Sequence, residues 1–184
     1  MDVFANLLLG FQTAASFVNL LYCLIGVALG TAILWFGWYG FNAGSEFGVD
    51  RITGLAFLNT DLAASFADPT WLLLDWIFTR KPRFLGFLTG CVAGLATITP
   101  CAGFVSTPSA VIIGILASCA CYLAVHLKNK AGLDDALDVF GVHGVGGILG
   151  ALLTGIFVNP ALGGVGVTDY LAADATAVTA AYDF

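Results

Sequence analysis

The chain has 184 residues, of which 59% are hydrophobic and only 10% are charged, and its formal net charge is −6. Soluble domains usually carry about 25% charged residues, so a chain this poor in charge is expected to lie in lipid rather than in water. The six Lys and Arg residues form no patch, which excludes nucleic acid as a partner. No metal-binding or cofactor motif occurs, and no nucleophile, base and orienting group converge, so neither a cofactor nor an enzymatic activity is predicted.

Five stretches are long and apolar enough to be candidate transmembrane helices, each of which needs about 20 mostly apolar residues. In chain order they cover about residues 17–41, 52–78, 84–98, 105–127 and 137–158. The predicted fold is therefore an all-α integral membrane protein with about five transmembrane helices.

The second stretch contains three carboxylates, Asp61, Asp68 and Asp75, and a proline, Pro69, that should kink it. Carboxylates inside a membrane are costly, so these side chains are expected to face protein, water or the interface.

Basic residues fall in two of the loops between these stretches. Arg80, Lys81 and Arg83 separate the second and third, and Lys128 and Lys130 separate the fourth and fifth. Cytoplasmic loops of membrane proteins are enriched in Lys and Arg. Both loops are therefore predicted to be cytoplasmic.

Glycines recur at a spacing of four residues within the apolar stretches. Small residues at this spacing let helix backbones approach one another closely in lipid. The repeats, which predict tight helix packing, are Gly86, Gly90 and Gly94, then Gly26 and Gly30, then Gly146 and Gly150.

One histidine, His143, lies within the apolar, glycine-rich fifth stretch, near its predicted mid-depth. Ionisable residues inside a membrane usually mark functional sites. A histidine that is hydrogen-bonded to a neighbouring helix would give the same pattern, and the residues alone leave both interpretations open.

An aromatic segment closes the first stretch at its outer end. Phe41 and Ser45 are four residues apart, so they share one face if the helix continues that far, and Trp38 lies one turn inward. An aromatic face beside a hydroxyl suits a small cation. An aromatic belt at the membrane interface is the alternative. Alone, the segment around Thr99 indicates a turn between two helices.

Taken together, several segments resemble the ammonium transporter (Amt/Mep/Rh) family, in the order and spacing of its C-terminal half. They are Trp38-Tyr-Gly-Phe-Asn-Ala-Gly-Ser, Leu55-Ala-Phe-Leu-Asn-Thr, Lys81-Pro, Gly94-Leu-Ala-Thr-Ile-Thr-Pro, Asp138-Val-Phe-Gly-Val-His-Gly-Val-Gly-Gly and Leu162-Gly-Gly-Val-Gly. The resemblance covers about residues 30–166 and is expected to continue to residue 184.

The resemblance implies a fold and a set of pore residues. The fold would be one half of a transporter built from two inverted five-helix halves. Phe41 matches a pore-blocking phenylalanine, Ser45 the serine of the outer ammonium site, and His143 one of two stacked pore histidines. Trp38 and Thr99 match residues that line the conduction path. The implied partners are ammonium or ammonia, the lipid bilayer, and either identical subunits in a trimer or the missing transporter half. The implied location is a cell membrane, as a multi-pass protein of the bacterial inner membrane.

The chain departs from the family at its beginning, where residues 1–30 resemble the start of the large membrane subunit of tripartite tricarboxylate transporters. We therefore expect an N-terminal membrane segment of different origin at residues 1–30 and a partial, ammonium-transporter-like C-terminal half at residues 31–184. The N-terminal half of the family and its last long helix are absent from this sequence.

Three functions remain open from the sequence. The leading hypothesis is ammonium or ammonia transport by a fragment that carries half of the conduction pathway and is inactive alone. The second is a membrane scaffold or interaction protein that does not transport. A tricarboxylate transporter subunit is the third, and it rests on residues 1–30 only.

Overall fold

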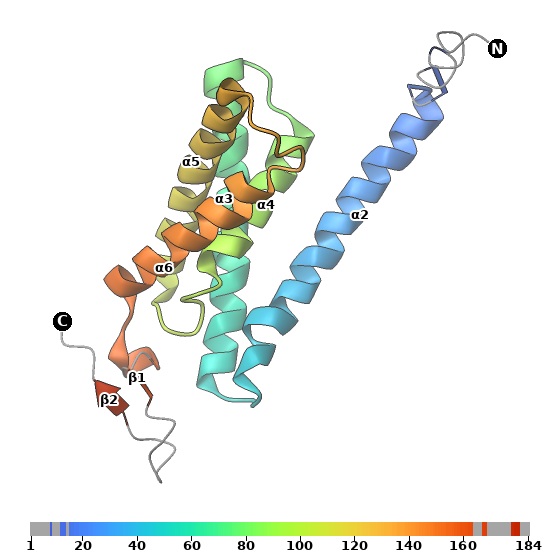
Figure 1. Ribbon diagram of the computed structural model, residues 1–184. Helices are drawn as coiled ribbons and strands as arrows, with labels where there is room; N and C mark the ends of the chain where they lie inside the picture. The colour runs from blue at the N-terminus through green and yellow to red at the C-terminus, as the bar shows by residue number, and fades with distance from the viewer. Residues whose placement is uncertain (1–7, 9–11, 14, 164–166, 169–177, 181–184) are drawn as a thin grey trace. The chain divides into compact units, whose positions relative to one another are not determined.

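The computed structural model describes residues 8, 12–13, 15–163, 167–168 and 178–180. In these residues the chain forms five long helices and a two-stranded antiparallel sheet near its C-terminus (Figure 1). The helices are α2 (Phe17–Asn42), α3 (Arg51–Thr79), α4 (Phe84–Ile98), α5 (Thr107–Ala131) and α6 (Val145–Phe157), and the strands are β1 (Val167–Thr168) and β2 (Val178–Ala180). Short helical turns η1 (Gly44–Glu46), η2 (Phe140–Gly144) and η3 (Pro160–Leu162) lie between or after them.

All five predicted helices are present, with ends that differ from the prediction by a few residues. Three described stretches are long and apolar enough to cross a membrane, at Phe17–Glu46, Thr107–Ala131 and Phe140–Phe157, and α4 is apolar but shorter. The prediction of an all-α integral membrane fold is therefore confirmed for the helices, and the short two-stranded sheet near the C-terminus was not predicted. Helix α3 continues through Pro69 without interruption.

The chain divides into two compact units, residues 1–36 and 37–184, so that the division falls within α2. In the first unit, α2 carries no charged residue between its start at Phe17 and the division. The last turns of α2, from Gly37 onward, belong to the second unit together with α3, α4, α5 and α6. The candidate pore residues all lie in this second unit.

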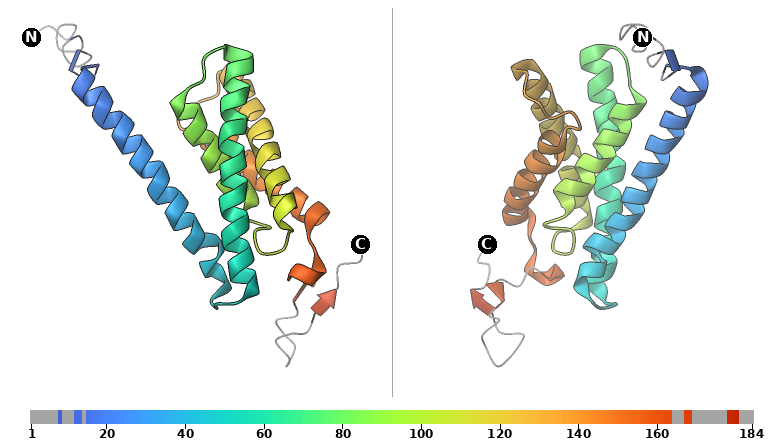
Figure 2. Two further views of the ribbon diagram at one scale, coloured as in Figure 1. Left: turned by 180° about the vertical axis from the view of Figure 1, so that it is seen from behind. Right: turned by 45° about the vertical axis from the view of Figure 1, so that its right-hand side comes forward.

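Helices α3, α4, α5 and α6 pack side by side into one bundle, as Figures 1 and 2 show from three directions. Glycines at the predicted spacing of four make the contact between α4 and α3. A Cβ on Gly94 would lie 2.6 Å from the Ala63 carbonyl oxygen, and one on Gly90 would lie 2.9 Å from the Ala67 carbonyl oxygen. Since even a methyl group would not fit, the prediction of tight packing is confirmed for this face.

The second glycine pair brings α6 against α4. A Cβ on Gly146 would lie 2.8 Å from Thr97 Oγ1, and one on Gly150 would overlap the Thr97 carbonyl oxygen. A Cβ on Gly26 or Gly30 would meet no atom within 4 Å. Close packing at Gly26 and Gly30 therefore stays a prediction.

The three carboxylates of α3 face protein, as expected from the cost of charge in a membrane. Asp61 accepts a hydrogen bond from the Tyr39 hydroxyl at 2.5 Å, and Asp68 is buried. Asp75 is fully buried and forms an ion pair with Arg83 at 2.7 Å. This bond with Asp75 raises the pKa of Arg83, which stands at the start of α4.

The helix ends are fixed by residues whose chemistry suits them. Asp50 accepts a hydrogen bond from the Thr53 backbone N–H at 2.9 Å, and this bond lowers the pKa of Asp50. At the C-terminal end of α5, Gly132 has a φ of 68°, a left-handed conformation that glycine adopts at little cost. These caps place the loops that connect the helices.

Candidate functional site

Trp38, in the last turns of α2, contacts the turn between α4 and α5. Its indole Nε1–H donates a hydrogen bond to the Thr99 hydroxyl oxygen at 2.8 Å. The Thr99 hydroxyl in turn donates to the Leu95 carbonyl oxygen at 2.8 Å. The hydroxyl is thus oriented by α4 while it holds the indole ring in place.

The same indole ring stacks on the imidazole of His143. Their ring centroids are 6.1 Å apart and their planes differ by 23°. Phe41 meets Trp38 edge-on, with centroids 5.8 Å apart and an interplanar angle of 86°. Four residues that were singled out in the sequence, from three separate segments, therefore lie together.

The fifth residue, Ser45, joins this group through a small pocket of about 210 Å³. Ser45, Phe41 and Thr99 all line it, beside the carboxylate-bearing side chain of Glu46. The Ser45 hydroxyl donates to the Phe41 carbonyl oxygen, as expected if the helical path of α2 continues through η1. The prediction that Phe41 and Ser45 share one face is thus confirmed.

His143 lies near the start of its helix, which corrects the expectation of a position near the middle of the fifth stretch. It is the fourth residue of the helical run Phe140–Phe157, whose first turn, η2, is a π-helix. The run begins later than expected because Asp138 has a φ of 53°, a left-handed conformation that ends regular structure. π-Helical turns are rare and occur frequently at functional sites.

Two residues that sequence reasoning did not single out for the site hold this π-turn in place. The Asp135 carboxylate accepts hydrogen bonds from the backbone N–H groups of Val139 and Phe140, at 2.9 and 3.0 Å. Lys128, which is almost fully buried, donates to the Asp135 carbonyl oxygen and to the Asp138 carboxylate, at 2.6 and 2.5 Å. An Asp shortly before an apolar helical run is the sequence signal that indicates the cap.

Two amides of the second unit fix the turn that carries Thr99 and the end of α2. Asn59, fully buried in α3, donates from Nδ2 to the carbonyl oxygens of Ala102 and Val105, at 2.8 and 2.9 Å. Asn42 donates from Nδ2 to the Thr60 hydroxyl at 3.0 Å. In the sequence, both amides stand out only as parts of longer motifs.

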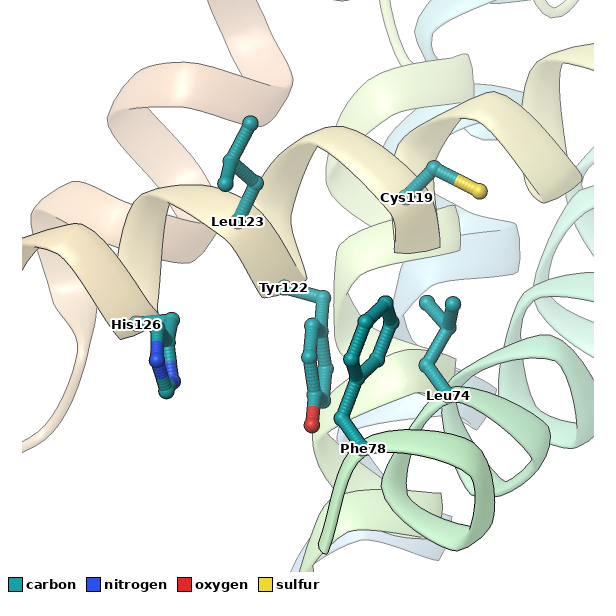
Figure 3. Close-up of a pocket in the computed structure, with 6 residues that line it drawn as sticks. All are labelled: Leu74, Phe78, Cys119, Tyr122, Leu123 and His126. Atoms are coloured by element: carbon teal, nitrogen blue, oxygen red, sulfur yellow. The ribbon is translucent and has the colours of Figure 1, made fainter.

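The group is open on one side. Phe41 is 59% exposed, and Ser45 and His143 are also exposed, whereas Trp38 and Thr99 are half-buried. His126, the second histidine of the chain, lines a different groove with Leu74 and Phe78 (Figure 3). Within the described residues no cluster of side chains suits a metal ion.

The arrangement offers an aromatic surface, hydroxyl oxygens, an imidazole and a nearby carboxylate. Aromatic faces attract cations through the ring quadrupole. A neutral imidazole offers one hydrogen-bond donor and one acceptor. Such a lining suits a small cation that can also donate hydrogen bonds, or its neutral conjugate base.

Comparison with known proteins places this geometry in context. The model of the Ammonium Transporter Family matches residues 19–181. An ammonium transporter from Aquifex aeolicus is 51% identical over 139 residues, which is 75% of this chain and 33% of the relative. One from Bacillus subtilis is 43% identical over 167 residues, or 90% of this chain and 40% of the relative. The chain therefore spans between a third and two fifths of the length of these relatives.

Solved structures agree with the sequence matches. The crystal structure of Mep2 from Candida albicans superposes with a TM-score of 0.71 and 43% sequence identity, over 73% of this chain and 30% of that protein. Because the identity is well above the level at which only the fold is shared, the fold and the motifs point to the same relatives.

Proposed function

The chain belongs to the Ammonium Transporter Family, and from this premise we propose that its 184 residues supply part of a pathway for ammonium or ammonia across a membrane. The observation that carries this proposal is the position of Trp38, whose ring stacks on His143 while its N–H is bonded to Thr99. These residues come from three separate segments of the chain. Hydrophobic packing alone does not explain why their polar groups meet beside an exposed surface.

Each residue has a role in the proposed pathway. Phe41 narrows the entrance, and Ser45 offers its hydroxyl to the ammonium ion there. Glu46, which lines the same pocket, attracts a cation by its charge. Beyond the entrance, His143 and Thr99 line the path along which neutral ammonia passes, since a neutral solute avoids most of the cost of burying a charge.

The exposed side of the site is proposed to face the rest of an inverted-repeat transporter. Substrate sites in such transporters lie where two repeats meet, and the exposure of His143 and Phe41 supports a second wall supplied by other residues. We also propose a homo-oligomer, a trimer by resemblance to the family, in a cell membrane such as the bacterial inner membrane. We also propose that residues 1–30 are a membrane segment of different origin and that residues 31–184 are the ammonium-transporter-like part.

A non-transporting scaffold and a tricarboxylate transporter subunit were the alternative functions. No geometric feature of the described residues favours either of them over transport. We therefore carry only ammonium transport forward.

The experiment that tests the proposal joins residues 31–184 to the remaining portion of the Aquifex aeolicus relative and measures methylammonium uptake into liposomes. We expect saturable uptake that ammonium inhibits. A completed protein that inserts and folds but does not transport would favour a scaffold and contradict the proposal. The intact Aquifex aeolicus protein is the positive control.

A further inference from the structure

The last turns of α2, which carry Trp38 and Phe41 of the candidate site, are attached to α3 by side chains on a neighbouring face of the helix. Tyr39 and Asn42 lie three residues apart and so share this face. This part of α2 approaches the backbone of α3 at few points, so side chains make most of the attachment. The position of the site residues on α2 therefore depends on a small set of contacts.

Tyr39 makes two of these contacts. Its hydroxyl donates a hydrogen bond to Asp61 Oδ1 at 2.5 Å, and its ring stacks on that of Phe57, with centroids 4.1 Å apart and an interplanar angle of 16°. A hydroxyl that donates to an ionised carboxylate makes a bond of about 2.5–2.7 Å, which is shorter and stronger than a bond between neutral groups. Phe57 and Asp61 lie one helical turn apart on α3, so they hold the tyrosine at its ring face and at its hydroxyl.

Asn42 adds a second attachment one turn further along α2. Its Nδ2 donates to the Thr60 hydroxyl at 3.0 Å, and this fully buried hydroxyl donates to the Ala56 carbonyl oxygen at 2.6 Å. Thr60 and Asp61 are adjacent in the sequence, so both attachments reach α3 at the same level. We call the five attaching residues the α2–α3 clasp: Tyr39 and Asn42 of α2, and Phe57, Thr60 and Asp61 of α3.

Asp61 is the unusual member of the clasp. It lies inside a stretch that the sequence predicts to cross the membrane, where a carboxylate is costly and usually marks a functional site. The fully buried carboxylate of the same helix is neutralised by an arginine, whereas Asp61 forms no ion pair in the part of the chain that the structure describes. Its hydrogen-bond donor is Tyr39, which stands between Trp38 and Phe41 in the chain. The costly group is thus bonded to the segment that carries the proposed entrance.

We propose that Tyr39 and Asp61 are positioning residues for the ammonium entrance, because their bond fixes the end of α2 and so the place of the entrance residues that it carries. This inference rests on the proposed function. Neither residue lines the pocket with Phe41 and Ser45, so both act through the helix and not by touching the cation. His143 is held separately by the supports of its own π-turn. Loss of the bond between Tyr39 and Asp61 therefore loosens the entrance and leaves the π-turn in place.

Amide hydrogen exchange of the purified 184-residue chain in detergent tests the attachment without any assumption about transport. Tyr39→Phe removes only the donor oxygen and Asp61→Leu removes the acceptor, so each variant should speed exchange at residues 38–43 about tenfold. Asp61→Asn keeps an acceptor oxygen in place and should change the exchange rate less than about threefold. Unchanged exchange in both Tyr39→Phe and Asp61→Leu would overturn the proposal.

Two further variants show whether one bond is responsible. Tyr22→Phe is the matched control, because Tyr22 lies on the same helix, is 67% exposed and makes no hydrogen bond among the residues that the structure describes. Faster exchange at residues 38–43 in Tyr22→Phe as well would show a general effect of the substitution and contradict the proposal. The double variant Tyr39→Phe/Asp61→Leu should exchange no faster than either single variant, since both remove the same bond. Additive effects would mean two unrelated contacts and would also overturn it.

Methylammonium uptake tests the effect on the entrance, in a transporter that joins residues 31–184 to the remaining portion of the Aquifex aeolicus relative. Tyr39→Phe should raise KM about fivefold and lower the maximal rate less than about twofold, because the cation is first bound by residues that α2 carries. Asp61→Asn should keep KM within about twofold of the original value, and Asp61→Leu should match Tyr39→Phe.

Two other outcomes separate this inference from its alternatives. If the charge of Asp61 attracted the cation directly, Asp61→Asn would raise KM as much as Asp61→Leu while Tyr39→Phe left it unchanged, and this result would overturn the proposal. No uptake by the joined transporter with the original residues would contradict the proposed function instead, and the exchange rates of the 184-residue chain would still decide whether the clasp positions the end of α2.

Discussion

Lys128 is expected to control the stability of the π-turn that carries His143. The Lys128 ammonium donates to the Asp135 carbonyl oxygen at 2.6 Å and to the Asp138 carboxylate at 2.5 Å, and the Lys128 side chain is 9% exposed. The change Lys128→Met keeps the length and apolar bulk of the side chain and removes both bonds. The prediction is that η2 opens more readily while the helical bundle stays folded.

The magnitude follows from the two bonds. A hydrogen bond that involves a charged group contributes about 1.5–3 kcal/mol. The two are not additive because they share one ammonium, and the Asp138 side chain is 31% exposed, so water screens part of that bond. We therefore expect the free energy of local opening to fall by about 2 kcal/mol, which corresponds to about 30-fold faster exchange of the protected amides.

Amide hydrogen exchange, followed by mass spectrometry in detergent, measures this effect over residues 139–144. Lys130→Met is the matched control, because Lys130 lies on the same helix, is exposed and forms no ion pair in the described residues. Exchange that accelerates equally in the two variants, or in neither, would refute the reasoning. Lys128→Arg should preserve most of the protection if charge rather than exact length matters.

Three further predictions concern topology, packing and completeness. In a variant without native cysteines, cysteines at Val49 and Asn129 should react with impermeant reagents from opposite sides of the membrane; reaction from one side only would remove the five-helix topology. Gly94→Ala should destabilise the protein by about 1–3 kcal/mol in thermal unfolding, because its Cβ would lie 2.6 Å from the Ala63 carbonyl oxygen. Gly54→Ala, with open space around its Cβ, should be neutral or stabilising by up to about 1 kcal/mol, and a similar loss in both would contradict the packing argument. The 184-residue chain alone should show no methylammonium uptake in liposomes, and robust uptake would mean that one repeat suffices.

Hydrophobicity was enough to predict the helices, because membrane spans follow from long apolar runs. The glycine spacing also predicted which faces of α4 and α6 pack closely, since a missing side chain is visible in the sequence and its effect is local. The ends were less predictable. The late start of the last helix depends on the left-handed conformation of Asp138, and nothing in the sequence distinguishes that aspartate from its neighbours.

The sequence suggested five residues for the candidate site but could not predict how they are arranged. Taken alone, Trp38 and Phe41 favoured an interfacial aromatic belt over a cation site. The five candidate residues were proposed because several motifs resemble one family. The bond between Trp38 and Thr99 joins residues 61 positions apart. Contacts over such distances depend on how helices pack, so Lys128, Asp135 and Asn59 were not recognised as supports of the site.

Conduction through the completed transporter, compared between the original sequence and His143→Ala, tests the central claim most directly. We expect His143→Ala to lower the rate of methylammonium uptake at least about tenfold, which corresponds to a rise of about 1.4 kcal/mol or more in the activation free energy. Ile148→Ala, an exposed position on the same helix outside the site, should leave the rate unchanged. Equal uptake by the original protein and His143→Ala would show that His143 only packs there, and would contradict the proposed pathway.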